Sequence, residues 1–254
     1  MLDRVSFIKS ERYPLNIEWN IERFEEVAST QDILKNSSAN SEGHVIVADR
    51  QTQGRGRYAR QWFDGEGNLM FSFALEPRCE ARFIGQLSLI IGLAVHNALQ
   101  GFIDTPEKLM LKWPNDVLLE GEKCCGILIE SSLSSSGLID KLFVGIGINV
   151  LQAPDDMGVS LSRYSSSSLM PSDVLHAVLG QVESLYTRFQ NGEAEVLLHE
   201  WSAYAHEIGQ PIEVKPHEGV LKGRYDGLDE LGNLYLRLED ESRKTISAAD
   251  IFLL

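Results

Sequence analysis

Short apolar stretches bounded by turn-forming residues dominate the first part of the chain. β-branched and aromatic residues in such stretches are typical of strands, which predicts strands at residues 16–28, 44–50 and 67–75. Between the first two, Ser29 or Thr30 can cap a short helix that runs to Asn36. Residues 84–102 are almost wholly apolar, and this pattern predicts a helix buried against a sheet.

The segment after Pro106 contains four strand-like runs separated by turn residues. Such closely spaced runs favour an antiparallel meander, with strands at residues 108–113, 116–120, 123–133 and 138–150. The apolar helix would cover one face of this meander. A serine-rich stretch then predicts a loop at residues 162–172, and two helical patterns follow at residues 172–190 and 193–207.

The pattern changes near Gly209, where five short strand-like stretches with Gly and Asp turns begin. Their combined length suits a small β-barrel. We therefore predict an α/β protein of the α+β type. A mixed, largely antiparallel sheet with covering helices would occupy residues 1–207, and a small β-barrel would occupy residues 208–254.

Composition narrows the functional classes. The formal net charge of −14 would repel a phosphate backbone, which argues against a general nucleic-acid binder and predicts no DNA partner. We find no apolar run that reaches the length needed to span a bilayer, so no membrane partner is expected. The N-terminus lacks the apolar core of a secretory signal. We therefore expect a cytoplasmic protein.

The cysteines suggest neither a disulfide framework nor a metal cluster. There are three of them, an odd number, and two are neighbours in the sequence: Cys79, Cys124 and Cys125. Zinc sites and disulfide scaffolds need cysteines in paired, regular spacings. We expect reduced thiols and assign no metal site to protein side chains.

A local basic cluster stands out against the acidic background. Residues 51–62, QTQGRGRYARQW, hold Arg55, Arg57 and Arg60 without an acid between them. Glycines let such a loop adopt unusual backbone angles, and arginines present bidentate donors to phosphate or carboxylate oxygens. The segment therefore predicts a mobile loop that folds over an anion. An ordinary solvated basic loop is the alternative.

Two further segments combine polar residues with glycines inside strands. In the first, Trp113 and Pro114 precede a polar pair, and Lys123 precedes a strand that contains Gly126. In the second, VGIGINV, two glycines two residues apart share one face of a strand. Strand glycines usually mark close approach by a ligand or another backbone. The second segment lacks the third glycine and following helix of a dinucleotide site, and a solvated hairpin lysine remains an alternative for Lys123.

These segments resemble the motifs of the biotin protein ligase family, in the same order. GRGRYARQW is similar to its GRGRRGRxW loop, KWPNDV to KWPND, KCCGILIE to KxxGILxE and GIGINV to GxGxN. The resemblance is specific over about residues 20–150. The β-rich tail matches the family's small SH3-like C-terminal barrel in length and pattern. The chain begins too close to its first motif to hold the helix-turn-helix domain of some members, so we expect the short form without DNA binding.

The resemblance implies roles for individual residues. The biotin-binding set comprises Ser29, Thr30, Gln31, Gln51, Arg55, Gly56, Arg57, Lys123, Gly126 and Gly145. The ATP-binding set comprises Arg57, Trp62, Lys112, Asn115, Lys123 and Asn149. The catalytic set comprises Lys123, Arg55, Arg57 and Asp116. Within these sets, the polar residues near Thr30 would read the ureido ring, and Asp116 would receive or orient the acceptor lysine.

The implied reaction forms biotinyl-5′-AMP from biotin and ATP and transfers biotin to a lysine of a biotin carboxyl carrier protein domain. Magnesium would be carried by the nucleotide phosphates, since no carboxylate cage is evident. A homodimer is one implied assembly. The chain departs from the family pattern at Gln31, where Asn is common, and at Tyr58 and Ala59, where the loop usually has Arg-Gly.

Two other functions remain open at this point. Lipoate or octanoate transfer enzymes share the fold, but their arginine-rich, triple-glycine segment with a following histidine is absent from this sequence. A non-enzymatic biotin-binding regulator would require the lysine or the loop arginines to be missing or idle. Lys123, Arg55 and Arg57 are all present.

Overall fold

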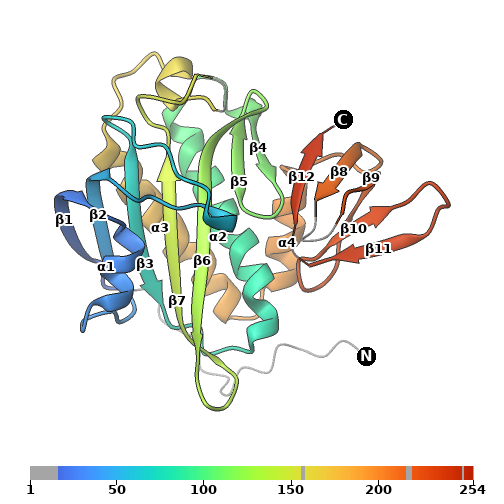
Figure 1. Ribbon diagram of the computed structural model, residues 1–254, viewed down its shortest axis with the longest axis horizontal. Coiled ribbons are helices and arrows are strands. Elements are labelled where there is room, and N and C mark those ends of the chain that lie inside the picture. The colour runs from blue at the N-terminus through green and yellow to red at the C-terminus, as the bar shows by residue number, and fades with distance from the viewer. Residues whose placement is uncertain (1–16, 156–157, 216–218, 248, 254) are drawn as a thin grey trace.

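Two β-sheets organise the protein, with helices packed mainly on one face of the larger sheet (Figure 1). The computed structural model describes residues 17–155, 158–215, 219–247 and 249–253. The larger sheet has the strand order β1-β2-β3-β7-β6-β5-β4. Its strands are β1 (Asn20–Val27), β2 (His44–Gln51), β3 (Leu69–Leu75), β4 (Leu109–Lys112), β5 (Asp116–Leu119), β6 (Glu122–Leu133) and β7 (Ile139–Ile148).

The sheet is mixed, as predicted. β1 pairs with β2 in parallel, and every other neighbouring pair is antiparallel. The parallel pair needs a crossover, which α1 (Thr30–Asn36) supplies. Ser29 caps this helix, because its hydroxyl accepts a hydrogen bond from the Asp32 backbone N–H at 3.4 Å. The predicted antiparallel meander is confirmed as β4 to β7.

Three longer helices cover one face of the sheet: α2 (Ile84–Leu99), α3 (Pro171–Gln190) and α4 (Ala194–Ala203). α1 and the loop between β2 and β3 lie on the opposite face (Figure 1). Short 3₁₀ turns complete the connections at η2 (Ala81–Phe83), η3 (Gln100–Phe102), η4 (Pro106–Lys108) and η5 (Leu161–Tyr164). The face that carries α1, called the site face from here on, is therefore not covered by the three longer helices.

The apolar helix corrects one expectation from the sequence. Residues Ala81–Phe102 are long and apolar enough to cross a membrane by length and composition, although no such run was expected. In the structure 72% of that window is buried, because α2 packs between the sheet and the helices α3 and α4. A helix packed between a sheet and other helices has little contact with water, and this explains why α2 is mostly apolar.

A β-bulge in β6 aims Lys123 at the site face. Cys125 stands opposite Val117, but Lys123 stands opposite Leu118, so Cys124 is the extra residue. Both cysteines are fully buried, and burial raises the pKa of the Cys124 thiol to about 12. All three cysteines are free, as expected. The bulge thus separates the buried thiols from the lysine beside them.

The C-terminal strands form the five-stranded antiparallel sheet expected for the small β-barrel, but the barrel is not closed in the described residues. The order is β11-β10-β9-β8-β12, with β8 (Pro211–Lys215), β9 (Leu221–Leu228), β10 (Leu234–Arg237), β11 (Arg243–Ile246) and β12 (Asp250–Leu253). β11 and β12 therefore lie at opposite edges. β11 exposes Arg243, Lys244 and Thr245, and a charged, solvated strand suits an edge.

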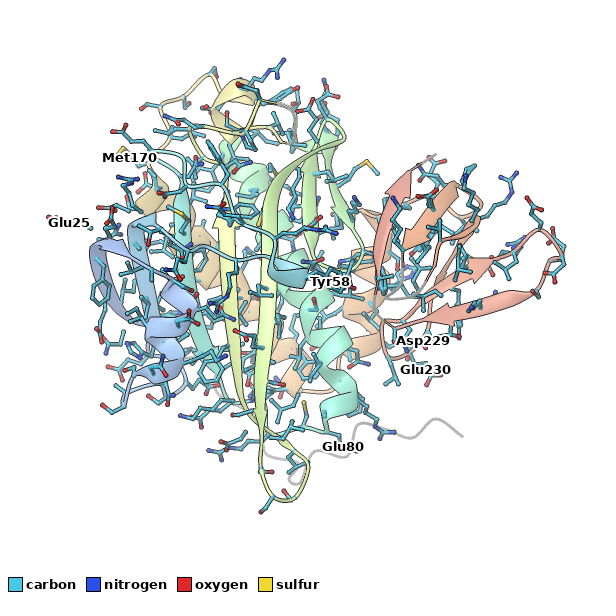
Figure 2. All side chains as sticks on the ribbon, viewed as in Figure 1. Glu25, Tyr58, Glu80, Met170, Asp229 and Glu230 are labelled. Atoms are coloured by element: carbon cyan, nitrogen blue, oxygen red, sulfur yellow. The ribbon has the colours of Figure 1, made fainter. Side chains whose placement is uncertain are left out.

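The C-terminal sheet is attached to the larger unit beside α2 and the β4–β5 hairpin (Figure 2). The indole N–H of Trp113 donates to the Gly232 carbonyl oxygen at 3.0 Å, and the Gln86 side-chain amide donates to the Glu230 carbonyl oxygen at 2.5 Å. Trp113 is buried and follows β4. This motif tryptophan therefore joins the two units.

Candidate active site

One cavity of about 660 Å³ lies on the site face, between the start of α1, the β2–β3 loop and strands β3, β5, β6 and β7. The structure brings together in its lining every residue predicted from the sequence: Ser29, Thr30, Gln31, Gln51, Arg55, Gly56, Arg57, Trp62, Lys112, Asn115, Asp116, Lys123, Gly126, Gly145 and Asn149. Segments far apart in the sequence therefore share a single site.

The inner end of the cavity is a hydrogen-bonded cluster of uncharged side chains. Gln51 Oε1 accepts from the Thr30 backbone N–H at 2.7 Å and from the Thr30 hydroxyl at 3.0 Å. The hydroxyls of Thr30 and Ser72 lie 2.8 Å apart, and Ser72 donates to Gln31 Oε1 at 3.2 Å. Because these residues hold one another, the cluster is rigid before any ligand arrives.

The strand glycines make room for protein side chains, which corrects the expectation that they admit a ligand or backbone directly. A Cβ atom added to Gly145 would lie within 3.0 Å of Gln31 Oε1. A Cβ atom on Gly147 would collide with the Trp62 indole, and one on Gly126 would lie 2.8 Å from it. Gln31 and Trp62 thus rest on bare backbone and form two parts of the cavity floor.

Lys123 lies in the middle of the site. Its Nζ is 2.6 Å from Asp116 Oδ1 and 5.4 Å from the centre of the Trp62 ring. The Lys123 side chain is about one-third exposed, at 34%. It also crosses Gly126, since a Cβ there would lie 2.9 Å from the Lys123 Nζ. A carboxylate and an aromatic face therefore fix one cation on the sheet.

The β2–β3 loop folds over the cavity through one 3₁₀ turn, η1 (Arg57–Ala59). The Gly56 N–H donates to the Arg60 carbonyl oxygen at 2.7 Å, which closes the turn. Arg55 forms two hydrogen bonds to Asp32, at 2.7 and 2.5 Å. The hydrogen bonds and charge of Arg55 lower the pKa of the Asp32 carboxyl. Sequence reasoning missed Asp32, although its place in the first turn of α1 was visible.

Arg57 links the loop to both structural units. Its guanidinium donates to Asn115 Oδ1 at 3.3 Å and to the Ala249 carbonyl oxygen at 3.0 Å. It also donates to the Tyr58 hydroxyl at 3.1 Å. Tyr58 has a left-handed backbone conformation, with φ of 56°, and its side chain is exposed at the front of the site (Figure 2). The motif residue Asn115 is oriented by its donation to the Ile127 carbonyl oxygen at 2.6 Å.

The cavity is a basic exception on an acidic protein. Its lining contains five basic side chains, Arg55, Arg57, Arg60, Lys112 and Lys123, and three acidic ones, Asp116, Glu122 and Asp155. In the described residues, no group of three or more His, Cys, Asp and Glu side chains is placed to hold a metal ion. The site is therefore suited to a ligand with several negative oxygens.

Several lining residues were not singled out from the sequence. Ser72 on β3 and Leu128 on β6 both stand opposite Gly145 on β7. They share the site face because residues opposite each other in a sheet point the same way. Strand register was the missing signal. The lining also includes Glu122, Pro154, Asp155 and Gly158.

Comparison with protein families agrees with this geometry. Residues 24–149 match the model of the biotin/lipoate A/B protein ligase family, and residues 208–254 match that of the biotin protein ligase C-terminal domain. The second match covers the open C-terminal sheet. The two matches together include all the predicted site residues.

Curated relatives cover nearly the whole chain. A biotin–[acetyl-CoA-carboxylase] ligase of Paracoccus denitrificans is 32% identical over 234 residues, covering 89% of this chain and 96% of that protein. The bifunctional ligase/repressor BirA of Bacillus subtilis is 32% identical over 238 residues, covering 89% of this chain and 72% of that protein.

A solved structure extends the likeness to three dimensions. The biotin protein ligase of Aquifex aeolicus in complex with biotin and ATP is similar to this chain with a TM-score of 0.79 and 34% identity. The match covers 92% of this chain and 98% of that one. With the four motifs gathered around one cavity, these likenesses establish that the chain belongs to the biotin protein ligase family.

Proposed function

We propose that this protein activates biotin with ATP as biotinyl-5′-AMP and then transfers biotin to a specific lysine of a biotin carboxyl carrier protein domain. Biotin ligation itself follows from the family. The observation that carries the detailed proposal is a single cavity with an uncharged, hydrogen-bonded inner end and a cationic outer part. The first suits the ureido ring of biotin, and the second suits the triphosphate.

In the first step, the biotin carboxylate attacks the α-phosphorus of ATP. A carbon–oxygen–phosphorus linkage forms, the bond to the β-phosphate oxygen breaks, and pyrophosphate leaves. Two anions must approach, so fixed cations have to offset their repulsion and the charge that develops on the phosphoryl oxygens. We assign this to Lys123, held on the sheet by Asp116, and to Arg55 and Arg57 on the loop.

The adenylate is a mixed anhydride that water hydrolyses, so the site must exclude solvent until the carrier arrives. The β2–β3 loop spans the cavity and is tied by Arg55 to α1 and by Arg57 to Asn115 and the C-terminal unit. We propose that these contacts, together with bonds to the phosphate, hold the loop closed.

In the second step, the neutral amine of the acceptor lysine attacks the acyl carbon. The new amide bond forms, the bond to the phosphate oxygen breaks, AMP leaves, and the amine loses a proton. A free lysine is protonated near neutral pH, so an acceptor for that proton has to be close. We assign this role to Asp116, whose second oxygen is not the one that contacts Lys123.

The remaining assignments are also proposals. Mg²⁺ would supply positive charge to the phosphates and be held mainly by the nucleotide; the basic lining fits a metal–nucleotide complex better than a bare metal ion.

A cytoplasmic location without membrane association suits a ligase acting on a carrier. The net charge of −14 supports the absence of a DNA partner. We keep the homodimer, and the division into residues 1–207 and 208–254, as proposals.

Two assays test the function. Biotin-dependent exchange of labelled pyrophosphate into ATP reports the first step, and avidin detection of a purified carrier domain reports the second. A matched carrier with its acceptor lysine changed to arginine controls for nonspecific labelling. Faster pyrophosphate exchange with lipoate or octanoate than with biotin would contradict the proposal. Biotin binding without any pyrophosphate exchange would also contradict it and would favour a non-enzymatic regulator.

A further inference from the structure

Glu130 contacts the biotin end of the cavity without lining it. It lies on β6, opposite Phe143 of β7, with a side chain that is 35% exposed. One of its oxygens accepts from Gln31 Nε2 at 3.1 Å, and the other pairs with Lys35 at 3.0 Å. Gln31, by contrast, is buried and lines the cavity.

The surroundings of Gln31 dictate which way its amide points. Gln31 Nε2 donates to Glu130 and to the Phe143 carbonyl oxygen at 3.3 Å. An ionised carboxylate and a backbone carbonyl can only accept hydrogen bonds. If the amide turned over, its oxygen would face two acceptors, so Gln31 Oε1 is directed to the other side. There it accepts from Ser72, above Gly145.

The orientation of the Gln51 amide is determined by its oxygen, whereas that of Gln31 is determined by its nitrogen. Gln51 Oε1 accepts from the backbone N–H of Thr30, a group that can only donate. The amide nitrogen of Gln51 therefore lies on the far side of its side chain from Thr30. It lies toward Gly54, where an added Cβ atom would be 3.1 Å from it. The hydroxyls of Thr30 and Ser72 lie 2.8 Å apart between the two glutamines. Both glutamines therefore turn their amide oxygens toward the hydroxyls of Thr30 and Ser72.

We propose that Glu130 is a positioning residue for acid recognition, because its charge fixes Gln31 with its oxygen toward the ligand. The proposal rests on the biotin ligase function and deepens it. A cyclic urea carries one carbonyl acceptor between two N–H donors, so a fixed acceptor above Gly145 matches one of its N–H groups. Gly145 then has a specific role, because any side chain there would displace the acceptor.

The isosteric variant Glu130→Gln tests this directly. A glutamine at that position can both donate and accept, so only the Phe143 carbonyl oxygen, at 3.3 Å, still favours the original orientation of Gln31. We expect the Kd for biotin to rise about tenfold, the scale of one charge-assisted hydrogen bond. The turnover number at saturating biotin should stay within about twofold, because Glu130 does not touch the reacting atoms.

Lys35→Ala is the matched control, since it removes the other partner of Glu130 and keeps the carboxylate. Its Kd should stay near the parental value. Calorimetry should also compare biotin with its cyclic carbamate analogues, in which one ring N–H is replaced by oxygen. The parental protein should reject at least one analogue strongly. In Glu130→Gln that discrimination should shrink several-fold, because Gln31 can turn its N–H₂ group toward the oxygen.

The outcomes separate the two claims. An unchanged biotin Kd in Glu130→Gln, or an equal loss for biotin and both analogues, would overturn the positioning role. Equal loss together with a lower melting temperature would assign Glu130 a purely structural role instead. If the parental protein itself fails to bind biotin, the proposed function fails, whatever the variants do.

Discussion

The two ends of the cavity hold their side chains in different ways. At the inner end, Thr30, Gln31 and Ser72 are almost fully buried, at 3%, 4% and 0% exposure, and each hydrogen-bonds to a neighbouring side chain of the cluster. At the outer end, Arg55 and Lys123 are about one-third exposed and each faces a carboxylate. The inner end presents uncharged groups whose hydrogen-bond directions are fixed, and the outer end presents cations that are paired with carboxylates.

This difference suits the two ligands. A neutral urea is recognised only if donors and acceptors face the correct way, and an unmatched buried polar group is costly. A triphosphate is recognised by charge, and partly exposed cations can exchange a protein carboxylate for a phosphate at little cost. We therefore expect changes at the inner end to alter affinity for the acid, and changes at the outer end to alter adenylate formation and retention.

The largest effect should come from Lys123→Ala. Lys123 is already positioned on the sheet by Asp116, so it can act during the first attack. Removing one preorganised stabiliser of developing charge typically lowers kcat by about 10²- to 10³-fold, and biotin-dependent pyrophosphate release measures this. Lys123→Arg should recover part of the rate, and Lys108→Ala, at the end of η4 just before β4, is the control. A parental rate in Lys123→Ala would remove the lysine from the first step.

Arg57→Gly should separate formation of the adenylate from its retention. Arg57 ties the loop to Asn115 and to Ala249, and its loss should speed loop opening by roughly ten- to a hundredfold. Adenylate that escapes would then acylate lysines of an unrelated protein, which an avidin blot detects. Arg82→Gly, at an exposed site elsewhere, serves as the control. Absence of such labelling while pyrophosphate is still released would contradict the closing role of Arg57.

Two glycines on one strand should affect different ligands. Gly145→Ala displaces Gln31 and should raise the KM for biotin, whereas Gly147→Ala displaces Trp62 and should raise the KM for ATP, each by about tenfold. Steady-state kinetics with each substrate varied distinguishes them. Gly180→Ala, where an added Cβ meets nothing within 4 Å, is the control. If both variants raise the same KM, the two ends of the cavity are not separate.

The smallest effect should be on stability. The hydrogen bonds and charge of Arg55 lower the pKa of Asp32 in the folded state. The pair therefore stabilises the fold above the unfolded pKa of Asp32, and this stabilisation is lost as pH falls through the folded pKa. Both side chains are more than a third exposed, so Asp32→Asn should cost under about 1 kcal/mol. Urea unfolding at neutral and acidic pH measures this; a cost that grows on acidification would contradict it.

Much of the fold was predictable because it depends on local patterns. The antiparallel meander followed from apolar runs and turn residues, whereas the parallel direction of the edge pair β1–β2 was seen only in the structure. Local patterns did not predict whether the C-terminal barrel is closed. Five short strands are compatible with an open or a closed sheet, and the polar residues of β11 keep it at an edge.

The sequence by itself determined which chemical groups the site contains. The arginines of the loop, Lys123 and the paired glycines could be recognised from four motifs and their order. Only the tertiary structure decided which of these groups touch. The bulge at Cys124 turns Lys123 to the site face, and the register of β7 places Gly145 below Gln31. Asp32 and Glu130 gained their partners in the same way, because strand register and helix placement bring together residues that no local pattern connects.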